Sequence, residues 1–165
     1  MHQLTSQRVF MLIMLTAFIL LTALPSLAND KSVIAIIVSN DHPTKLLSLS
    51  ELKMIYWRKK SHWANGQRMH PVNLPSAHPL RLQFSNSVLG SLPNTQNSYW
   101  NGLYFHGISP PHVVHSDEAA IRYVQETTGS IAYIDACKID NRVTAILWIM
   151  PNGDTTSDEV HINCN

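Results

Sequence analysis

Apolar residues fall into four short blocks that predict β-strands: 33–38, 69–74, 131–134 and 143–149. The first block is continuous and mostly β-branched. That pattern is typical of a strand buried on both faces, as in parallel sheets. Turn-forming residues follow it, beginning with Ser39 and Asn40. Four buried blocks of this length predict one sheet.

Apolar residues at helical spacing predict four helices between these strands, beginning near Leu49, Ser76, Thr95 and Ser116. Ser48 and Glu51 have the spacing of a capping box, which favours a helix start at Leu49. We expect Ser76 to cap a helix that runs through Leu89. Strands that alternate with helices predict a layered α/β domain.

The N-terminal residues have the order of a secretory signal. Arg8 is followed by a run without charge over 9–24, and small residues occupy the end of Ser26-Leu27-Ala28. We expect residues 1–28 to be a cleavable signal peptide and 29–165 to be the exported domain. The alternative is an N-terminal anchor that is not cleaved, although the apolar run is slightly short for a membrane span of about 20 residues.

Removing residues 1–28 changes the charge balance. Arg8 is the only one of the 12 Lys and Arg in that segment, so the remainder carries as many basic residues as its 11 Asp and Glu. A net charge near zero argues against nucleic acid as a partner. The remaining 137 of the 165 residues are enough for one domain.

Two cysteines, Cys137 and Cys164, lie in the exported part. An even number of cysteines in an exported chain predicts a disulfide between them. The alternative is two free thiols. In either case we expect a structural role, because no C-x-x-C pattern is present.

The sequence contains no catalytic motif of the G-x-S-x-G or H-E-x-x-H type and no glycine-rich phosphate loop. We therefore expect neither an enzyme nor a cofactor. His106, His112 and His115 lie close in sequence and could in principle ligate a metal. No carboxylate or cysteine joins them in sequence, so we interpret them as surface or capping residues and expect no metal.

The most informative polar cluster surrounds the predicted helix start at Ser76. Helix N-termini present unpaired N–H groups that suit anions. His78 and Arg81 lie within the next turn and a half, and a cation beside free N–H groups suits phosphate or sulfate. The alternative is that Ser76 only caps its helix and Arg81 is solvated.

The order of these segments resembles the phosphate-binding proteins of bacterial ABC transporters, in a short form with the type II periplasmic-binding-protein fold. The matching stretches are Val33–Asn40, Leu49–Tyr56 followed by Trp63 and Gly66, Pro75–Phe84, and Gly129–Ile134. The resemblance implies binding of a small oxyanion, most of all phosphate, in the periplasm. It also implies a membrane transporter or sensor as partner. We expect a ligand set of Ser39, Asn40, Ser76, His78 and Arg81, in which His78 and Arg81 are chosen for their place beside the predicted helix start and not from the resemblance.

The chain departs from that family in two ways. An early segment with its own phosphate-contacting loop has no counterpart, and the family's Ser-Gly-Thr falls on His78-Pro79-Leu80. The substitution removes two hydroxyls and one backbone N–H. These departures support an alternative function as a protein–protein module, to which the aromatic residues in 99–105 could contribute a contact surface.

Overall fold

A computed structural model describes residues 31–43 and 46–164, and the expected signal peptide lies outside this part of the chain. The described residues form β1 (Ile34–Ser39), α2 (Leu49–Tyr56), β2 (His70–Asn73), α3 (Pro79–Phe84), α4 (Asn97–Tyr104), β3 (His112–Val113), α5 (Asp117–Glu126), β4 (Ser130–Asp135), β5 (Val143–Ile149) and β6 (Thr155–Thr156). A π-helix at Ser85–Leu89 continues α3, and 3₁₀ turns lie at Pro93–Thr95 and Ala136–Lys138. The four predicted strand blocks are confirmed.

The strands form one sheet in the order β3-β2-β4-β1-β5-β6. Strand β1 lies between β4 and β5 and is antiparallel to both, with Ile36 opposite Tyr133 on one side and Leu147 on the other. It is buried on both faces, as predicted. The predicted parallel pairing of this strand is wrong, because a continuous apolar run reports burial and not the direction of the neighbouring strands. Parallel pairing occurs instead between β2 and each of β3 and β4.

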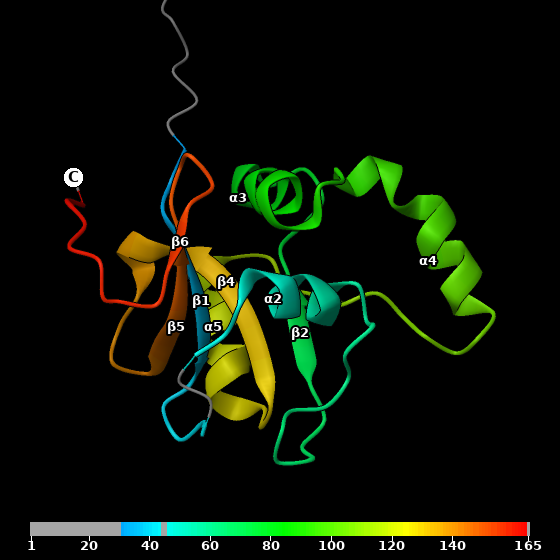
Figure 1. Cartoon of the computed structure of the whole chain (residues 1–165), viewed down its shortest axis with the longest axis horizontal. Helices are drawn as coiled ribbons and strands as arrows, with labels where there is room; N and C mark the ends of the chain where they lie inside the picture. Colours follow the sequence, from blue (N-terminus) through cyan, green and yellow to red (C-terminus); the bar gives the residue numbers. More distant parts are fainter. Residues whose placement is uncertain (1–30, 44–45, 165) are drawn as a thin grey trace, which may run out of the picture. The chain divides into compact units, whose positions relative to one another are not determined.

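Helices α2 and α5 cover opposite faces of the sheet (Figure 1). Helix α2 buries the predicted stripe of Leu52, Ile55 and Tyr56. Helix α5 buries the adjacent residues Ala120 and Ile121, and Val124 one turn later. The sheet and these helices share one hydrophobic core. None of the helices in the described residues is long and apolar enough to cross a membrane.

The helix starts follow their capping residues. Ser48 and Glu51 form the predicted capping box, and Ser116 caps α5 by accepting from the Ala119 N–H at 3.1 Å. The predicted cap at Ser76 is wrong, because α3 begins at Pro79 with His78 as its cap. A proline favours the first helical position and keeps the residue before it extended. His78 accordingly has φ −67° and ψ 132°.

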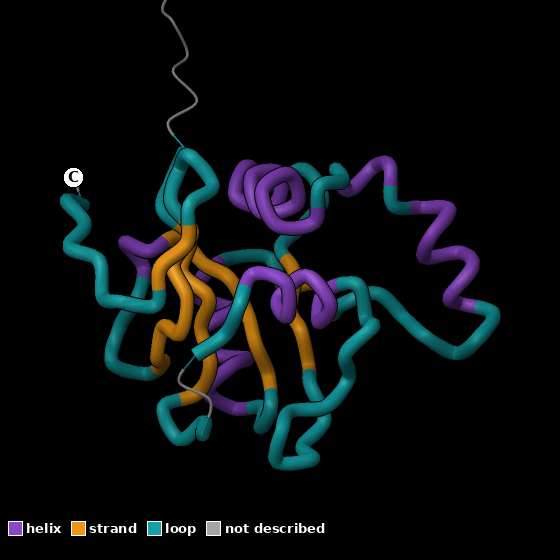
Figure 2. The backbone as a smooth tube through the Cα atoms, viewed as in Figure 1, coloured by secondary structure: helices purple, strands orange, loops and turns teal. Residues whose placement is uncertain are grey.

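Helix α4 extends away from the sheet (Figure 2) and contains no buried residue. The first turn is attached to the end of α2. There the Tyr99 hydroxyl donates to the Trp57 carbonyl at 2.7 Å, and the ring of Trp57 contacts the rings of Tyr99 and Trp100. The last turn has no such contact, and Tyr104 is 71% exposed. This segment is therefore a projecting arm held at one end.

Cys137 and Cys164 form the predicted disulfide, with their Cα atoms 5.6 Å apart. The bond joins the 3₁₀ turn after β4 to the end of the described chain. Val160 and Ile162 in that tail are partly buried against the core. The cross-link thus holds a polar tail that has few apolar contacts of its own.

Candidate functional site

Three parallel strands end at one edge of the sheet, and two helices begin there. Strands β2 and β4 both run toward this edge from their paired residues His70 and Ser130. At this edge the backbone N–H of Asp135, the last residue of β4, donates to the side chain of Asp117, the first residue of α5, at 3.3 Å. Ligands of α/β proteins characteristically bind at the carboxyl ends of parallel strands. This edge is therefore the first place to examine for a site.

The turn that leads from β2 into α3 carries Ser76 and His78. Ser76 is exposed in the turn. His78 Nδ1 accepts from the Leu80 N–H at 3.2 Å, so in the neutral ring the proton is on Nε2. The His78 N–H is also occupied, since it donates to the Pro75 carbonyl at 2.9 Å. Pro79 has no N–H, so this turn offers an anion few backbone donors.

Arg81 lies in the middle of α3 and is only 6% exposed. Its Nη2 donates to the Gln96 side-chain oxygen at 3.4 Å, whereas Nε and Nη1 are buried without a hydrogen-bond partner. No ion pair involving Arg81 is present in residues 31–43 and 46–164. A buried charge is costly unless it is paired. The Arg81 guanidinium is thus a buried cation without an anion.

Tyr56 and Tyr133 lie close enough to Arg81 to interact with its charge. The ring of Phe84 stacks on Tyr133 and is tilted against Tyr56. Burial lowers the pKa of the Arg81 guanidinium, and the two neighbouring tyrosines oppose this shift. Burial also raises the pKa of Tyr133 to about 12, although the Arg81 charge acts in the opposite direction. Both tyrosines therefore remain neutral near pH 7 and cannot serve as counter-ions.

Gln96 and Trp100 complete this cluster, although the sequence predicted neither of them as a residue of the anion site. Gln96 is 1% exposed, and its side-chain oxygen accepts from both Arg81 Nη2 and Trp100 Nε1, the latter at 3.3 Å. The Gln96 amide nitrogen donates to the Ser91 carbonyl at 2.8 Å. The only local sequence signal is that Gln96 and Trp100 are one helical turn apart. Nothing in the sequence indicates that they contact Arg81.

The start of α5 lies at the same edge but does not suit an anion. Its first two residues are Asp117 and Glu118. Glu118 is held by Arg142 and Arg122, and this pairing lowers its pKa to about 2. Burial raises the pKa of Asp117, with partial compensation from the Asp135 N–H and the nearby His78. Two carboxylates in the first turn would repel a second anion there.

Ser39 and Asn40 lie at the opposite edge of the sheet from the other expected ligand residues. Ser39 is the last residue of β1 and Asn40 follows it. Strand β1 is antiparallel to β4, and Ser39 pairs with Val143 at the start of β5. The Asn40 side chain donates to the Asn141 carbonyl and accepts from the Thr144 hydroxyl, each at 2.7 Å. A six-residue strand separates the two edges by roughly 17 Å. The five expected ligand residues therefore do not form one site.

The histidines at 106, 112 and 115 are exposed, and His112 stacks on Tyr123 with ring centroids 5.0 Å apart. Across the described residues there is no group of three or more His, Cys, Asp or Glu side chains placed to hold a metal ion.

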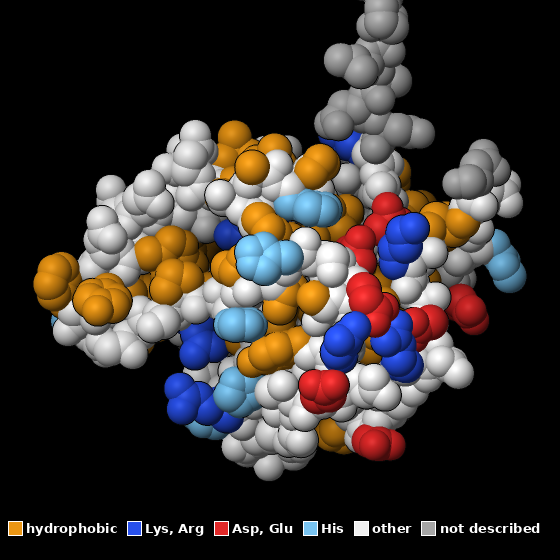
Figure 3. All heavy atoms as spheres, turned by 180° about the vertical axis from the view of Figure 1, so that it is seen from behind, with side chains coloured by type: hydrophobic (Ala, Val, Ile, Leu, Met, Phe, Trp, Pro, Cys, Tyr) orange, Lys and Arg blue, Asp and Glu red, His pale blue; other side chains and the backbone are white. Residues whose placement is uncertain are grey.

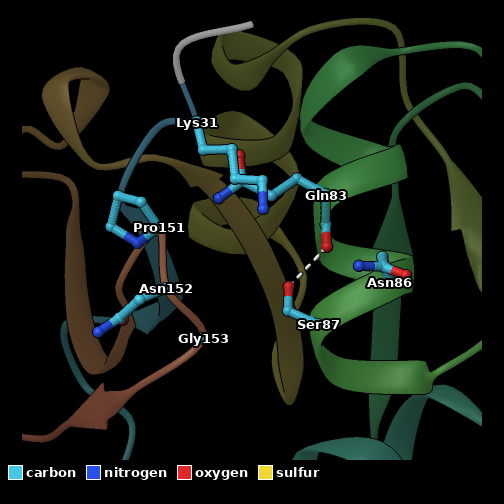
Figure 4. Close-up of a pocket in the computed structure, with 7 residues that line it drawn as sticks. All are labelled: Lys31, Gln83, Asn86, Ser87, Pro151, Asn152 and Gly153. Carbon is cyan, nitrogen blue, oxygen red and sulfur yellow. Dashed lines mark hydrogen bonds between the residues drawn. The ribbon is translucent and has the colours of Figure 1, made fainter.

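A separate surface pocket of about 250 Å³ lies between α3 and the turn from β5 to β6 (Figure 4). Of the described residues that line it, only Lys31 is charged. Its polar side chains are largely engaged, because Gln83 donates to the Ser32 carbonyl and Ser87 donates to the Gln83 carbonyl, both at 2.6 Å. Gln83 and Arg81 are two positions apart in α3 and do not share a helix face. This pocket is therefore distinct from the Arg81 cluster.

Comparison with solved structures identifies the fold. An ABC-type phosphate transport receptor from Vibrio cholerae matches with a TM-score of 0.57 and 20% identity, over 70% of this chain and 46% of the receptor. A putative phosphate ABC transporter substrate-binding protein with bound phosphate, from Clostridium perfringens, matches with a TM-score of 0.58 and 20% identity, over 70% of this chain and 45% of that protein. PstS from Borrelia burgdorferi matches with a TM-score of 0.51 and 16% identity, over 64% of this chain and 42% of that protein.

The fold is therefore the α/β fold of phosphate-binding substrate-binding proteins, as the sequence resemblance predicted. The aligned part of this chain covers less than half the length of each of these structures. No protein-family model matches the sequence. No curated protein matches it significantly either.

Proposed function

We propose that this chain binds a small oxyanion, with phosphate as the preferred ligand, as a solute-binding component of transport or sensing in the periplasm. The observation that carries the proposal is the buried Arg81 guanidinium, which among the described residues has two nitrogens without partners and no paired carboxylate. A planar guanidinium recognises phosphate through paired N–H groups. The fold shared with phosphate-binding proteins supports the choice of ligand.

In the proposed site, side chains and not backbone N–H groups would bind the anion. The turn at 76–80 has lost the hydroxyls of the Ser-Gly-Thr loop and offers few free N–H groups. Arg81 would supply the charge, and His78 Nε2 and the exposed Ser76 hydroxyl are the polar groups of the turn that precedes it. Ser39 and Asn40 are not part of this proposal, because they lie at the other edge of the sheet.

The proposed location outside the cytoplasm rests on two features. The N-terminal residues have the order of a signal peptide, for which we propose cleavage after residue 28. The disulfide between Cys137 and Cys164 is the kind of bond that persists in oxidising compartments. A membrane transporter or sensor is the partner that a solute-binding component requires.

Titration calorimetry of residues 29–165 with phosphate tests this function, with sulfate as the comparison anion. We expect saturable heat with phosphate and weaker binding of sulfate. Folding is checked by circular dichroism in the same buffer. No heat at millimolar phosphate from folded protein would exclude the proposal.

A second candidate function is a protein–protein module, and the end of the projecting arm favours it. Tyr104 and Phe105 are 71% and 86% exposed, and their rings contact each other. Figure 3 shows hydrophobic side chains gathered on this projecting arm. Exposed aromatic pairs are enriched at protein interfaces. A photo-crosslinking residue at Phe105 should give one defined adduct in intact cells, with none from the same probe at exposed Gln125.

A further inference from the structure

We infer that the side-chain oxygen of Gln96 occupies the place of a ligand oxygen, and that a bound oxyanion displaces it to contact Arg81 and Trp100 together. This inference rests on the proposed function and adds two residues to the site. Trp100 would donate to the ligand, and Gln96 would act as a plug, a side chain that occupies the ligand's place until the anion displaces it.

Two N–H donors converge on the side-chain oxygen of Gln96. Arg81 Nη2 and Trp100 Nε1 come from different helical segments, and both donate to the Gln96 side-chain oxygen. The distances are 3.4 Å and 3.3 Å, whereas a well-formed N–H···O bond is about 2.9 Å long. One neutral amide oxygen therefore satisfies both donors poorly. A phosphate oxygen at that position would carry charge and accept both bonds.

The guanidinium leaves unused donors beside the nitrogen that contacts Gln96. Nη2 carries two hydrogens, one on the edge shared with Nε and one on the edge shared with Nη1, and both Nε and Nη1 are without a partner. The Gln96 oxygen therefore occupies one of the two bidentate edges. An anion that uses that edge and also accepts from Trp100 Nε1 must take the place of the Gln96 oxygen, because both contacts now converge on it.

The projecting arm that carries Gln96 and Trp100 is attached to the rest of the domain by few contacts. Gln96 immediately precedes α4, which has no buried residue and is held mainly through Tyr99 and Trp57. Gly90 and Gly107 bound this segment, and both have positive φ, at 65° and 72°. The arm can therefore shift to admit an anion at little cost in buried apolar area. Rotation of the Gln96 side chain then frees the donors, while Trp100 stays one turn further along the same helix.

Three variants test this arrangement by phosphate calorimetry on residues 29–165. Gln96→Glu places a carboxylate beside Arg81 and should weaken phosphate binding by about tenfold or more, since a charged partner competes strongly. Gln96→Ala removes the plug and should tighten binding by about two- to tenfold. Trp100→Phe removes one donor and should weaken binding by about two- to tenfold. Gln125→Glu on the exposed face of α5 makes the same charge change elsewhere and should bind as the wild type does.

The outcomes separate this inference from the proposed function. If the wild type binds phosphate and folded Gln96→Glu and Trp100→Phe bind it equally well, displacement of Gln96 by the anion is excluded, while the proposed function stands. If folded wild type binds no phosphate, both are excluded. Circular dichroism of each variant establishes folding. Should Gln96→Ala unfold, Gln96→Glu and Trp100→Phe still decide the question.

Discussion

The ring of Phe84 lies flat on the ring of Tyr133, with centroids 3.9 Å apart and planes 6° apart. Phe84 ends α3, and Tyr133 lies in β4, so this stacking fixes the helix over the sheet. Arg81 is three residues before Phe84 and shares its side of the helix. The position of the buried cation therefore depends on an aromatic contact with the core.

The Tyr133 hydroxyl is the polar part of this contact. The Leu74 N–H donates to it at 3.1 Å, and it donates to the Asn73 side-chain oxygen at 3.3 Å. Tyr133→Phe leaves the buried Leu74 N–H without a partner and should lower the free energy of unfolding by about 1–3 kcal/mol. Urea denaturation measures this change. Tyr123→Phe, at a partly exposed tyrosine, should stay within about 0.5 kcal/mol of the wild type, and equal values for both variants would contradict the assignment.

Both the backbone conformation and the close packing at Gly129 favour glycine over any residue with a side chain. Its φ is +81°, and an added Cβ would lie 2.3 Å from the Arg68 carbonyl oxygen. The Gly129 carbonyl also accepts from Trp63 Nε1 at 2.9 Å. Gly129→Ala should therefore cost more than the roughly 1–2 kcal/mol of a left-handed backbone alone.

Gly66 provides the matched control for this prediction. Its φ is +83°, but an added Cβ would meet nothing within 4 Å. Gly66→Ala should thus show only the backbone cost, and the difference between the two variants measures the collision with Arg68. Thermal unfolding of both proteins checks this, and equal losses of stability would show that the collision is absent.

The local structure of this chain was predictable from sequence, and much of the site was not. The capping box of Ser48 and Glu51 and the buried stripe of α2 depend on residues within one or two turns. The start of α3 at Pro79 is also a local feature, because a proline favours the first helical position. The capping pattern at Ser76 pointed to an earlier start. By contrast, the direction of β1 depends on the partner strands β4 and β5, which lie about 100 residues later in the chain. That direction places Asn40 at the edge opposite Arg81.

The disulfide should stabilise the fold without affecting the ligand. Cys137 and Cys164 close a loop with a sequence separation of 27, which corresponds to about 3–4 kcal/mol in the chain-entropy account. The double variant Cys137→Ser with Cys164→Ser should lose about this much stability and exchange backbone hydrogen rapidly over residues 157–164. Phosphate affinity should not change. If both thiols alkylate without reductant in protein taken from the periplasm, the bond is absent there.

Asp117 should make stability depend on pH. Burial is the main reason that its pKa is raised in the folded protein, so the fold holds the proton more tightly than the unfolded chain does. Its contribution is then most favourable below the unfolded pKa and is lost as the pH rises through the folded pKa. Asp117→Asn keeps an oxygen that can accept from the Asp135 N–H. This variant should be more stable than the wild type at pH 7, and its advantage should shrink at acid pH.

Denaturant titrations at several pH values measure this effect. Asp158→Asn, in the exposed tail, is the matched control and should show no such trend against the wild type. A pH-independent difference between Asp117→Asn and the wild type would contradict the assignment of the shift to burial.

The central claim is that Arg81 holds the anion, and equilibrium dialysis against radiolabelled phosphate tests it most directly. Three proteins are compared: residues 29–165 of the wild type, Arg81→Met and Arg122→Met, the last of which removes the same charge from the exposed surface of α5. The account predicts saturable binding by the wild type and Arg122→Met, and loss of binding by folded Arg81→Met. Equal binding by all three proteins would contradict it.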